Sequence, residues 1–234
     1  MRHDSYITKP VLYAPYGQGG KPNILNTDLY CFLTEEYSAG RNNMEVAREL
    51  VQAGVKIIQY REKDKKQRAK YQECLEIRKI TGPAGVTFIV NDDIEIARLV
   101  GADGVHLGQD DLPVQEARKL VGTSMIIGIS THSPQQAREA IAGGADYIGV
   151  GPIFKTFTKK DVCNPVGLDY LRWAVNHVNI PFVTIGGIKK HNLVEVKRNG
   201  AGCVGIVTEI LGTSNIAKEI QALRDLIRQA RTQV

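Results

Sequence analysis

The chain has 234 residues, of which 43% are hydrophobic and 24% are charged, a balance that is typical of a folded globular protein and excludes extensive disorder. The net charge is +5, but basic and acidic residues are interleaved, as in "REKDKKQRAK", which disfavours nucleic acid and leaves small anionic molecules as the expected partners. No segment approaches the roughly 18 apolar residues of a membrane helix, and "MRHDSYITKP" lacks the apolar centre of a signal peptide. We therefore expect a cytoplasmic protein without a membrane partner.

The first 28 residues precede the first clear strand and contain the Gly/Pro-rich segment "YAPYGQGGKPN". This composition predicts an N-terminal extension over 1–28. A single catalytic domain is expected over 29–234, because one α/β barrel often reaches this length.

Eight short runs rich in Val and Ile follow, and longer amphipathic segments separate them. Their nearly continuous apolar character is typical of parallel strands that are covered on both faces. We expect strands at 29–34, 55–61, 86–91, 104–107, 125–130, 146–151, 181–186 and 203–207.

The segments between the runs have helical periodicity, as in "NMEVARELVQAG" and "SPQQAREAIAGGA", and several end in Gly, the usual residue after a helix. Eight strand-then-helix units predict a (β/α)8 TIM barrel, and an open doubly wound sheet is the alternative.

Polar residues gather where these strands are expected to end, which is where barrels carry their chemistry. Strand two ends in "QYREK", strand three in "NDD" and strand four in "GQDD", while strand five ends at Ser130. The first three of these endings place Arg61, Lys63, Asp92 and Asp111 at one mouth.

Arg61 and Lys63 precede a helix, whose N-terminus already carries partial positive charge. Basic side chains are unfavourable there unless an anion is bound, so both are predicted to bind an anion. Lys65, Lys66 and Arg68 are expected to be solvated.

Asp110 and Asp111 have two interpretations. Asp is a favoured N-cap residue, and Pro113 suits a first helical turn, so the pair is consistent with a helix start. Alternatively, Asp92 and Asp111 leave adjacent strands and converge on one cation. Carboxylate oxygens of this kind suit Mg²⁺, and water molecules and substrate phosphates would complete its coordination shell.

Two further segments suggest phosphate binding. "IGGI" and "GIVTEI" close strands seven and eight, where barrels often bind phosphate through backbone N–H groups, although a Gly pair is also common in ordinary turns. The longest loop, at about 151–166, contains "KTFTKKD" and resembles a lid over phosphates, with a mobile polar loop as the alternative. Two anion sites imply a bisphosphate or two phosphorylated substrates.

Seven motifs, in their order and spacing, resemble those of thiamin-phosphate synthases over about 29–212. The motifs are "QYREK", "VNDD", "GADGVHLGQDDLP", "IIGISTHS", "GADYIGVGPIFKTFTKK", "IPFVTIGGI" and "GAGCVGIVTEI". The resemblance implies a transferase that condenses hydroxymethylpyrimidine diphosphate with hydroxyethylthiazole phosphate and releases pyrophosphate. It also implies that pyrophosphate leaves first and that the thiazole nitrogen captures the resulting pyrimidine methylene cation. Such a step needs its leaving-group charge neutralised more than it needs a general base.

The resemblance also implies roles for individual residues. Pyrimidine diphosphate would bind to Gln59, Tyr60, Arg61, Glu62, Lys63, Asn91, Ser130 and Lys159, of which Arg61, Lys63, Ser130 and Lys159 would be catalytic. Thiazole phosphate would bind to Thr156, Phe157, Thr158, Gly187, Val207 and Thr208, and Asp92 with Asp111 would hold Mg²⁺. The sequence leaves room for a homo-oligomer.

Two alternatives use the same barrel. A thiazole tautomerase handles a thiazole phosphate without a diphosphate partner, so it should not need Arg61, Lys63, Asp92, Asp111 and Lys159. A non-catalytic phosphometabolite-binding protein would bind ligand but release no pyrophosphate.

Overall fold

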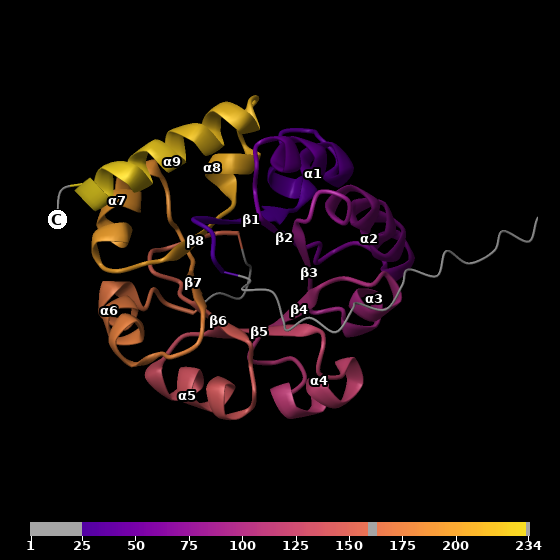
Figure 1. The fold of residues 1–234 in the computed structure, drawn as a ribbon, viewed down its shortest axis with the longest axis horizontal. Helices are drawn as coiled ribbons and strands as arrows, with labels where there is room; N and C mark the ends of the chain where they lie inside the picture. Colours follow the sequence, from indigo (N-terminus) through magenta and orange to yellow (C-terminus); the bar gives the residue numbers. More distant parts are fainter. Residues whose placement is uncertain (1–24, 159–162, 233–234) are drawn as a thin grey trace, which may run out of the picture.

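The computed structural model describes residues 25–158 and 163–232. In this part of the chain eight parallel strands, each hydrogen-bonded to the next, close into a barrel as β8 pairs with β1 (Figure 1). The strands are β1 (Leu29–Leu33), β2 (Ile57–Tyr60), β3 (Thr87–Asn91), β4 (Gly104–Leu107), β5 (Ile126–Thr131), β6 (Tyr147–Val150), β7 (Phe182–Thr184) and β8 (Cys203–Ile206).

Helices form a ring outside the strands (Figure 1). They are α1 (Asn43–Gln52), α2 (Gln67–Thr81), α3 (Ile94–Leu99), α4 (Val114–Val121), α5 (Pro134–Ala142), α6 (Gly167–His177), α7 (Lys190–Arg198), α8 (Thr208–Leu211) and α9 (Ile216–Thr232), with a short 3₁₀ turn η1 (Glu35–Tyr37) after β1. No helix in the described ranges is long and apolar enough to cross a membrane.

The predicted (β/α)8 barrel is confirmed, and closure of the sheet excludes the doubly wound alternative. Every expected strand is present, with ends that differ by one or two residues for most strands. Residues 1–24 lie outside the described residues, so the N-terminal extension and the domain division stay predictions.

Side chains of each strand alternate between two apolar clusters, because successive residues of a strand point to opposite faces. Tyr30, Ile57 and Tyr147 belong to a cluster inside the barrel, whereas Cys31, Ile58 and Ile148 pack outward under the helices. The same alternation decides which residues at the strand ends face the interior.

Helix α4 begins at Val114, with Pro113 as its N-cap and no side-chain cap. The capping interpretation of Asp110 and Asp111 is therefore wrong. The Asp111 carboxylate instead accepts a hydrogen bond from the Gly108 N–H at 2.6 Å, within the turn that leaves β4. The preceding β4–α4 segment is thus held by Asp111 without using it to start the helix.

Gly128 of β5 is required by the aromatic side chain beside it. Its register partner on β6 is Tyr147, whose ring is fully buried inside the barrel. A Cβ added at Gly128 would lie 2.1 Å from Cζ of that ring, which is a severe overlap. The absence of a side chain on β5 therefore makes room for a phenol in the barrel interior.

Replacing Gly128 by Ala should consequently destabilise the fold by about 3 kcal/mol, since overpacking a rigid core forces side chains and backbone to shift. The matched control is Gly202→Ala, because a Cβ there meets nothing within 4 Å. Urea denaturation followed by circular dichroism measures the difference. Equal midpoints for the two variants would contradict the steric argument.

Candidate active site

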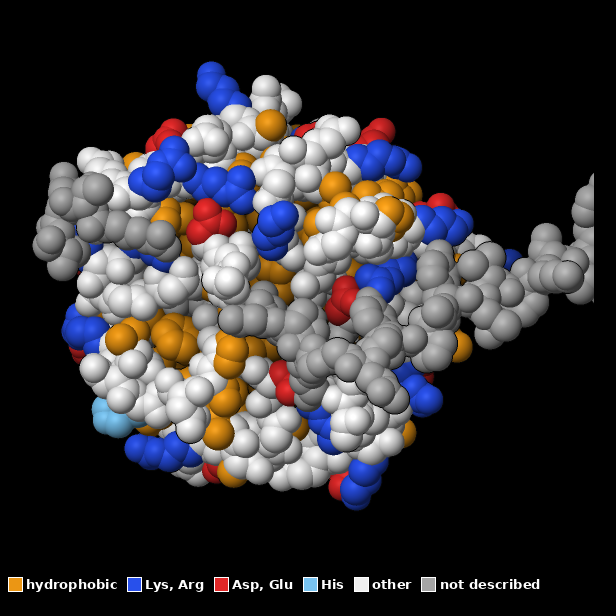
Figure 2. All heavy atoms as spheres, in the orientation of Figure 1, with side chains coloured by type: hydrophobic (Ala, Val, Ile, Leu, Met, Phe, Trp, Pro, Cys, Tyr) orange, Lys and Arg blue, Asp and Glu red, His pale blue; other side chains and the backbone are white. Residues whose placement is uncertain are grey.

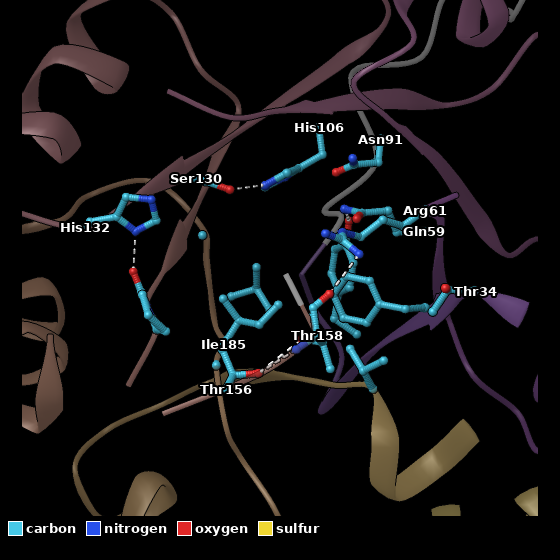
Figure 3. Close-up of a pocket in the computed structure, with 18 residues that line it drawn as sticks. Thr34, Gln59, Arg61, Asn91, His106, Ser130, His132, Thr156, Thr158 and Ile185 are labelled. Atoms are coloured by element: carbon cyan, nitrogen blue, oxygen red, sulfur yellow. Dashed lines mark hydrogen bonds between the residues drawn. The ribbon is translucent and has the colours of Figure 1, made fainter. Parts of the chain in front are cut away.

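The carboxyl ends of the strands surround a pocket of about 120 Å³, here called the central pocket. All eight strands or the loops that follow them contribute to its wall, as expected for a barrel mouth (Figure 3). Its polar lining consists of Tyr30, Thr34, Gln59, Arg61, Asn91, His106, Ser130, His132, Thr156 and Thr158, and Val183, Ile185 and Val207 are among its apolar residues.

Seven of the residues that the sequence assigns to substrate line this pocket. They are Gln59, Arg61, Asn91, Ser130, Thr156, Thr158 and Val207. Gln59 is almost completely buried, and its Nε2 donates to the Tyr30 hydroxyl at 2.7 Å. The structure thus brings together residues that are up to 148 positions apart, from Gln59 to Val207.

A second, more polar hollow adjoins the central pocket and shares Arg61, Asn91 and Ser130 with it. It is also lined by Lys63, Asp92, Gly108, Gln109, Asp110 and Asp111, and we call it the charged hollow. Asp92 has a φ of 62°, a left-handed conformation that non-glycine residues rarely adopt. Its carboxylate accepts a hydrogen bond from the Lys63 ammonium group.

The charged hollow suits Mg²⁺ by the chemistry of its donors. Magnesium is commonly held by one or two carboxylates, with water and substrate phosphate as the other ligands. Asp92 and Asp111 meet this requirement on neighbouring strand ends, and one Asp111 oxygen remains after Oδ2 accepts from Gly108. The described residues contain no group of three or more His, Cys, Asp or Glu placed to bind a metal.

The segment "QYREK" divides into inward and outward residues. Tyr60 packs outside the strands, and its hydroxyl donates to Glu73 of α2 at 2.9 Å. The Glu62 carboxylate accepts from the Glu35 N–H and from Asn43 Nδ2, both at 2.7 Å. These contacts attach the β2–α2 loop, which carries Arg61 and Lys63, to the turn after β1 and to α1.

Lys65 holds the same cluster together. Its ammonium group lies 2.7 Å from Glu35 and 2.5 Å from Glu73. Burial lowers the pKa of Lys65, but the hydrogen bonds that it donates to these two carboxylates, together with the charges of Glu62 and Glu73, raise its pKa above the usual value. The expectation that Lys65 is solvated is therefore wrong, since its side chain is only 22% exposed and pairs with partly buried carboxylates.

The loop between β6 and α6 reaches across the mouth to β2. Arg61 Nη1 donates to the Thr158 carbonyl at 3.2 Å, and the Thr156 and Thr158 hydroxyls lie 3.1 Å apart (Figure 3). Phe157 is 79% exposed, with the Lys155 ammonium group 5.3 Å from its ring centroid. Lys159 lies outside the described residues, so its predicted role stays a prediction.

Packing alone requires glycine at positions 186 and 187, whether or not the pair binds a phosphate. Both residues have positive φ, and a Cβ at Gly186 would lie 2.3 Å from Pro152 Cα. A Cβ at Gly187 would lie 2.6 Å from the Lys155 carbonyl oxygen. The β7–α7 turn therefore lies directly against the loop after β6. Thr208, another residue predicted to bind this phosphate, is the first residue of α8.

Two histidines that the sequence analysis assigns no role also line the central pocket. His106 Nε2 lies 2.9 Å from the Ser130 hydroxyl, and His132 Nδ1 donates to the Gly151 carbonyl at 2.5 Å (Figure 3). Both occur at positions that the period-two alternation directs inward, which is the signal that could have identified them.

Arg61 and Lys63 lie beside two carboxylates at the mouth of a closed (β/α)8 barrel. This arrangement is typical of barrel enzymes that bind phosphorylated small molecules. Residues 29–210 match the family model described as thiamine monophosphate synthase. The chain belongs to this family, which confirms the resemblance of its seven motifs.

Named relatives agree with the family match. The chain is 58% identical to a thiamine-phosphate synthase of Pelotomaculum thermopropionicum, over 89% of this chain and 95% of the relative. It is 54% identical to a thiamine-phosphate synthase of Lawsonia intracellularis, over 89% and 96%. The solved thiamine phosphate pyrophosphorylase of Pyrococcus furiosus is 32% identical and superposes with a TM-score of 0.80, over 89% of this chain and 98% of that one.

The surface around the barrel shows charges of both signs. On the face in Figure 2, Lys and Arg side chains lie among Asp and Glu side chains around the rim.

The Glu62 contacts can be tested by Glu62→Ala. This change leaves the Glu35 N–H and one Asn43 donor without their acceptor, which should cost about 1–3 kcal/mol of stability. It should also weaken binding of the diphosphate substrate, because Arg61 and Lys63 flank Glu62. Glu36→Ala, on an exposed side chain of η1, is the control. Thermal unfolding measures the change in stability, and calorimetric titration measures the affinity for the diphosphate substrate. Identical stability and affinity of the two variants would show that Glu62 does not support the loop.

Proposed function

We propose that the chain condenses hydroxymethylpyrimidine diphosphate with hydroxyethylthiazole phosphate to give thiamin monophosphate and pyrophosphate. The observation that carries the proposal is the junction of the central pocket with the charged hollow at Arg61, Asn91 and Ser130. An apolar-walled pocket beside a hollow of cations and carboxylates matches an organic ring that carries a diphosphate. Family membership supports the same activity and confirms the expectation of an enzyme.

The diphosphate would occupy the charged hollow. Arg61 and Lys63 would neutralise its charge, and the Ser130 hydroxyl with the Asn91 amide would hydrogen-bond to it at the border with the central pocket. Gln59, inside the central pocket, would contact the pyrimidine ring. Departure of pyrophosphate leaves a cation on the pyrimidine methylene, so these groups act mainly by stabilising negative charge on the leaving group.

Magnesium would be held by Asp92 and Asp111. When bound, it supplies Lewis-acid stabilisation of the departing pyrophosphate. Lys63 neutralises Asp92, and the Gly108 N–H holds the Asp111 carboxylate. These contacts keep both carboxylates ordered on one side of the hollow.

The thiazole phosphate would bind on the opposite side of the central pocket, between the loops after β6, β7 and β8. Thr156, Thr158 and Val207 line the pocket there. The two threonines would offer hydroxyls, and Gly187, Val207 and Thr208 would offer backbone N–H groups. Phe157, which is exposed on the same loop, would cover the bound thiazole. A cytoplasmic location and a homo-oligomeric state stay predictions.

The tautomerase alternative is disfavoured by the charged hollow itself. That reaction uses no diphosphate, yet Arg61, Lys63, Asp92 and Asp111 line one hollow. A binding protein without catalysis would need the same contacts, so only turnover separates it from the synthase.

Incubating the protein with both substrates and Mg²⁺ should therefore yield thiamin monophosphate and an equal amount of pyrophosphate. Mass spectrometry detects the first product and a coupled phosphate assay the second. Folded protein that binds both substrates without forming either product would favour the binding protein. Conversion of the thiazole phosphate alone would favour the tautomerase.

Asp111 and Asp110 provide a sharper test of the metal site. Asp111→Asn keeps an acceptor for the Gly108 N–H but removes the charge, so the Mg²⁺-dependent rate should fall by about 10²–10³. Asp110→Asn makes the same chemical change at the neighbouring exposed residue and should retain most of the rate. Rates are measured over a range of Mg²⁺ concentrations, and equal losses in the two variants would mean that the assignment within the pair is wrong.

A further inference from the structure

A continuous chain of four hydrogen bonds, three of them fully buried, crosses the barrel interior below the central pocket. Gln59 Nε2 lies 2.7 Å from the Tyr30 hydroxyl, and this hydroxyl lies 2.9 Å from that of Tyr147. The Tyr147 hydroxyl lies 2.8 Å from His106 Nδ1, and His106 Nε2 lies 2.9 Å from Ser130 Oγ. The chain joins β2, β1, β6, β4 and β5, and its two ends line the pocket (Figure 3).

The proton positions along this chain depend on one another. Gln59 donates to Tyr30 through Nε2, so the single Tyr30 hydrogen is left for the Tyr147 oxygen. Tyr147 then donates to His106 Nδ1, which must be the unprotonated ring nitrogen. A neutral imidazole carries its hydrogen on the other nitrogen, and Nε2 therefore donates to Ser130 Oγ.

We propose that Tyr30, Tyr147 and His106 are positioning residues that fix the direction of this chain, so that Ser130 presents its hydroxyl hydrogen, and Gln59 its amide oxygen, to the pocket. The inference rests on the proposed function, because the Ser130 hydrogen is then available to an anionic diphosphate oxygen. In the opposite direction Ser130 would give its hydrogen to His106 and turn lone pairs toward the same anion. The direction of the chain therefore decides whether Ser130 attracts or repels the leaving group.

The surroundings of the chain keep it in one arrangement. Tyr30, Gln59 and Tyr147 are at most 3% exposed, and His106 is 8% exposed, so bulk water has little access to replace a partner. Burial raises the pKa of both phenols far above the usual value, which keeps their hydrogens in place. Gly128 makes room for the Tyr147 ring, as described above.

A first test uses the unmodified protein and needs no turnover. In protein with ¹⁵N-labelled histidine, the ring nitrogens of His106 should show a neutral imidazole with hydrogen on Nε2, and His106→Gln assigns the signal among the five histidines. Hydrogen on Nδ1, or an imidazolium ion at neutral pH, would overturn the proposal. Because the measurement reads the ring directly, it remains valid even if the proposed condensation fails.

A second test compares two Tyr→Phe changes. Tyr147→Phe breaks the chain and should give a mixture of His106 tautomers, with kcat/KM for the pyrimidine diphosphate reduced about fivefold to tenfold. KM for the thiazole phosphate should not change. Tyr170→Phe is the control, because its buried hydroxyl bonds to Thr131 Oγ1 at 2.7 Å on the outer side of the strands. A Tyr147→Phe protein with one Nε2–H tautomer and kcat/KM equal to that of Tyr170→Phe would overturn the proposal.

Discussion

Closure of the parallel sheet is the constraint on which the rest of the structure depends. Once β8 pairs with β1, every strand has two hydrogen-bonded neighbours, and alternate side chains of all eight strands must share one interior. That interior cannot hold eight large residues in each layer. Gly104, Gly128 and Gly205 therefore lie where neighbouring atoms fill the space, most severely at Gly128. The same constraint aims Gln59, His106 and Ser130 at a common pocket.

Polar residues in such an interior need partners, because a buried group without one costs more free energy than a hydrogen bond normally contributes. The chain from Gln59 to Ser130 meets this need with side chains from five strands. Outside the strands, the cluster of Glu35, Glu62, Lys65 and Glu73 meets it around the β2–α2 loop. The two networks lie on opposite sides of β2, and together they hold the inner and outer faces of the strand that carries Gln59 and Tyr60.

Much of this arrangement can be predicted from the sequence. The strands are recognisable because both of their faces are buried, so their apolar runs are nearly continuous. The charged strand ends are recognisable because Arg61, Asp92 and Asp111 directly follow those runs. "QYREK", however, cannot be treated as one unit, since Tyr60 and Glu62 face outward and their partners come from residues 73, 35 and 43. Such distant contacts leave no local pattern. The role of His106 cannot be predicted for another reason. Inside "GVHL" it resembles one more residue of a buried strand, and its hydrogen-bond partners Ser130 and Tyr147 come from β5 and β6.

The contact between Lys63 and Asp92 gives each of these two charged groups a counter-ion within the protein. In the proposed function, a diphosphate at Lys63 and a divalent cation at Asp92 would exchange this internal ion pair for two pairs with ligands. Neither the Asp92 carboxylate nor the Lys63 ammonium group would be left without a counter-ion by this exchange. Binding of the anion and binding of the metal would consequently be coupled. An anion at Lys63 would free Asp92 for the metal, and a metal at Asp92 would free Lys63 for the anion. Binding one ligand without the other leaves an unpaired charge, which provides a physical basis for the two to enter together.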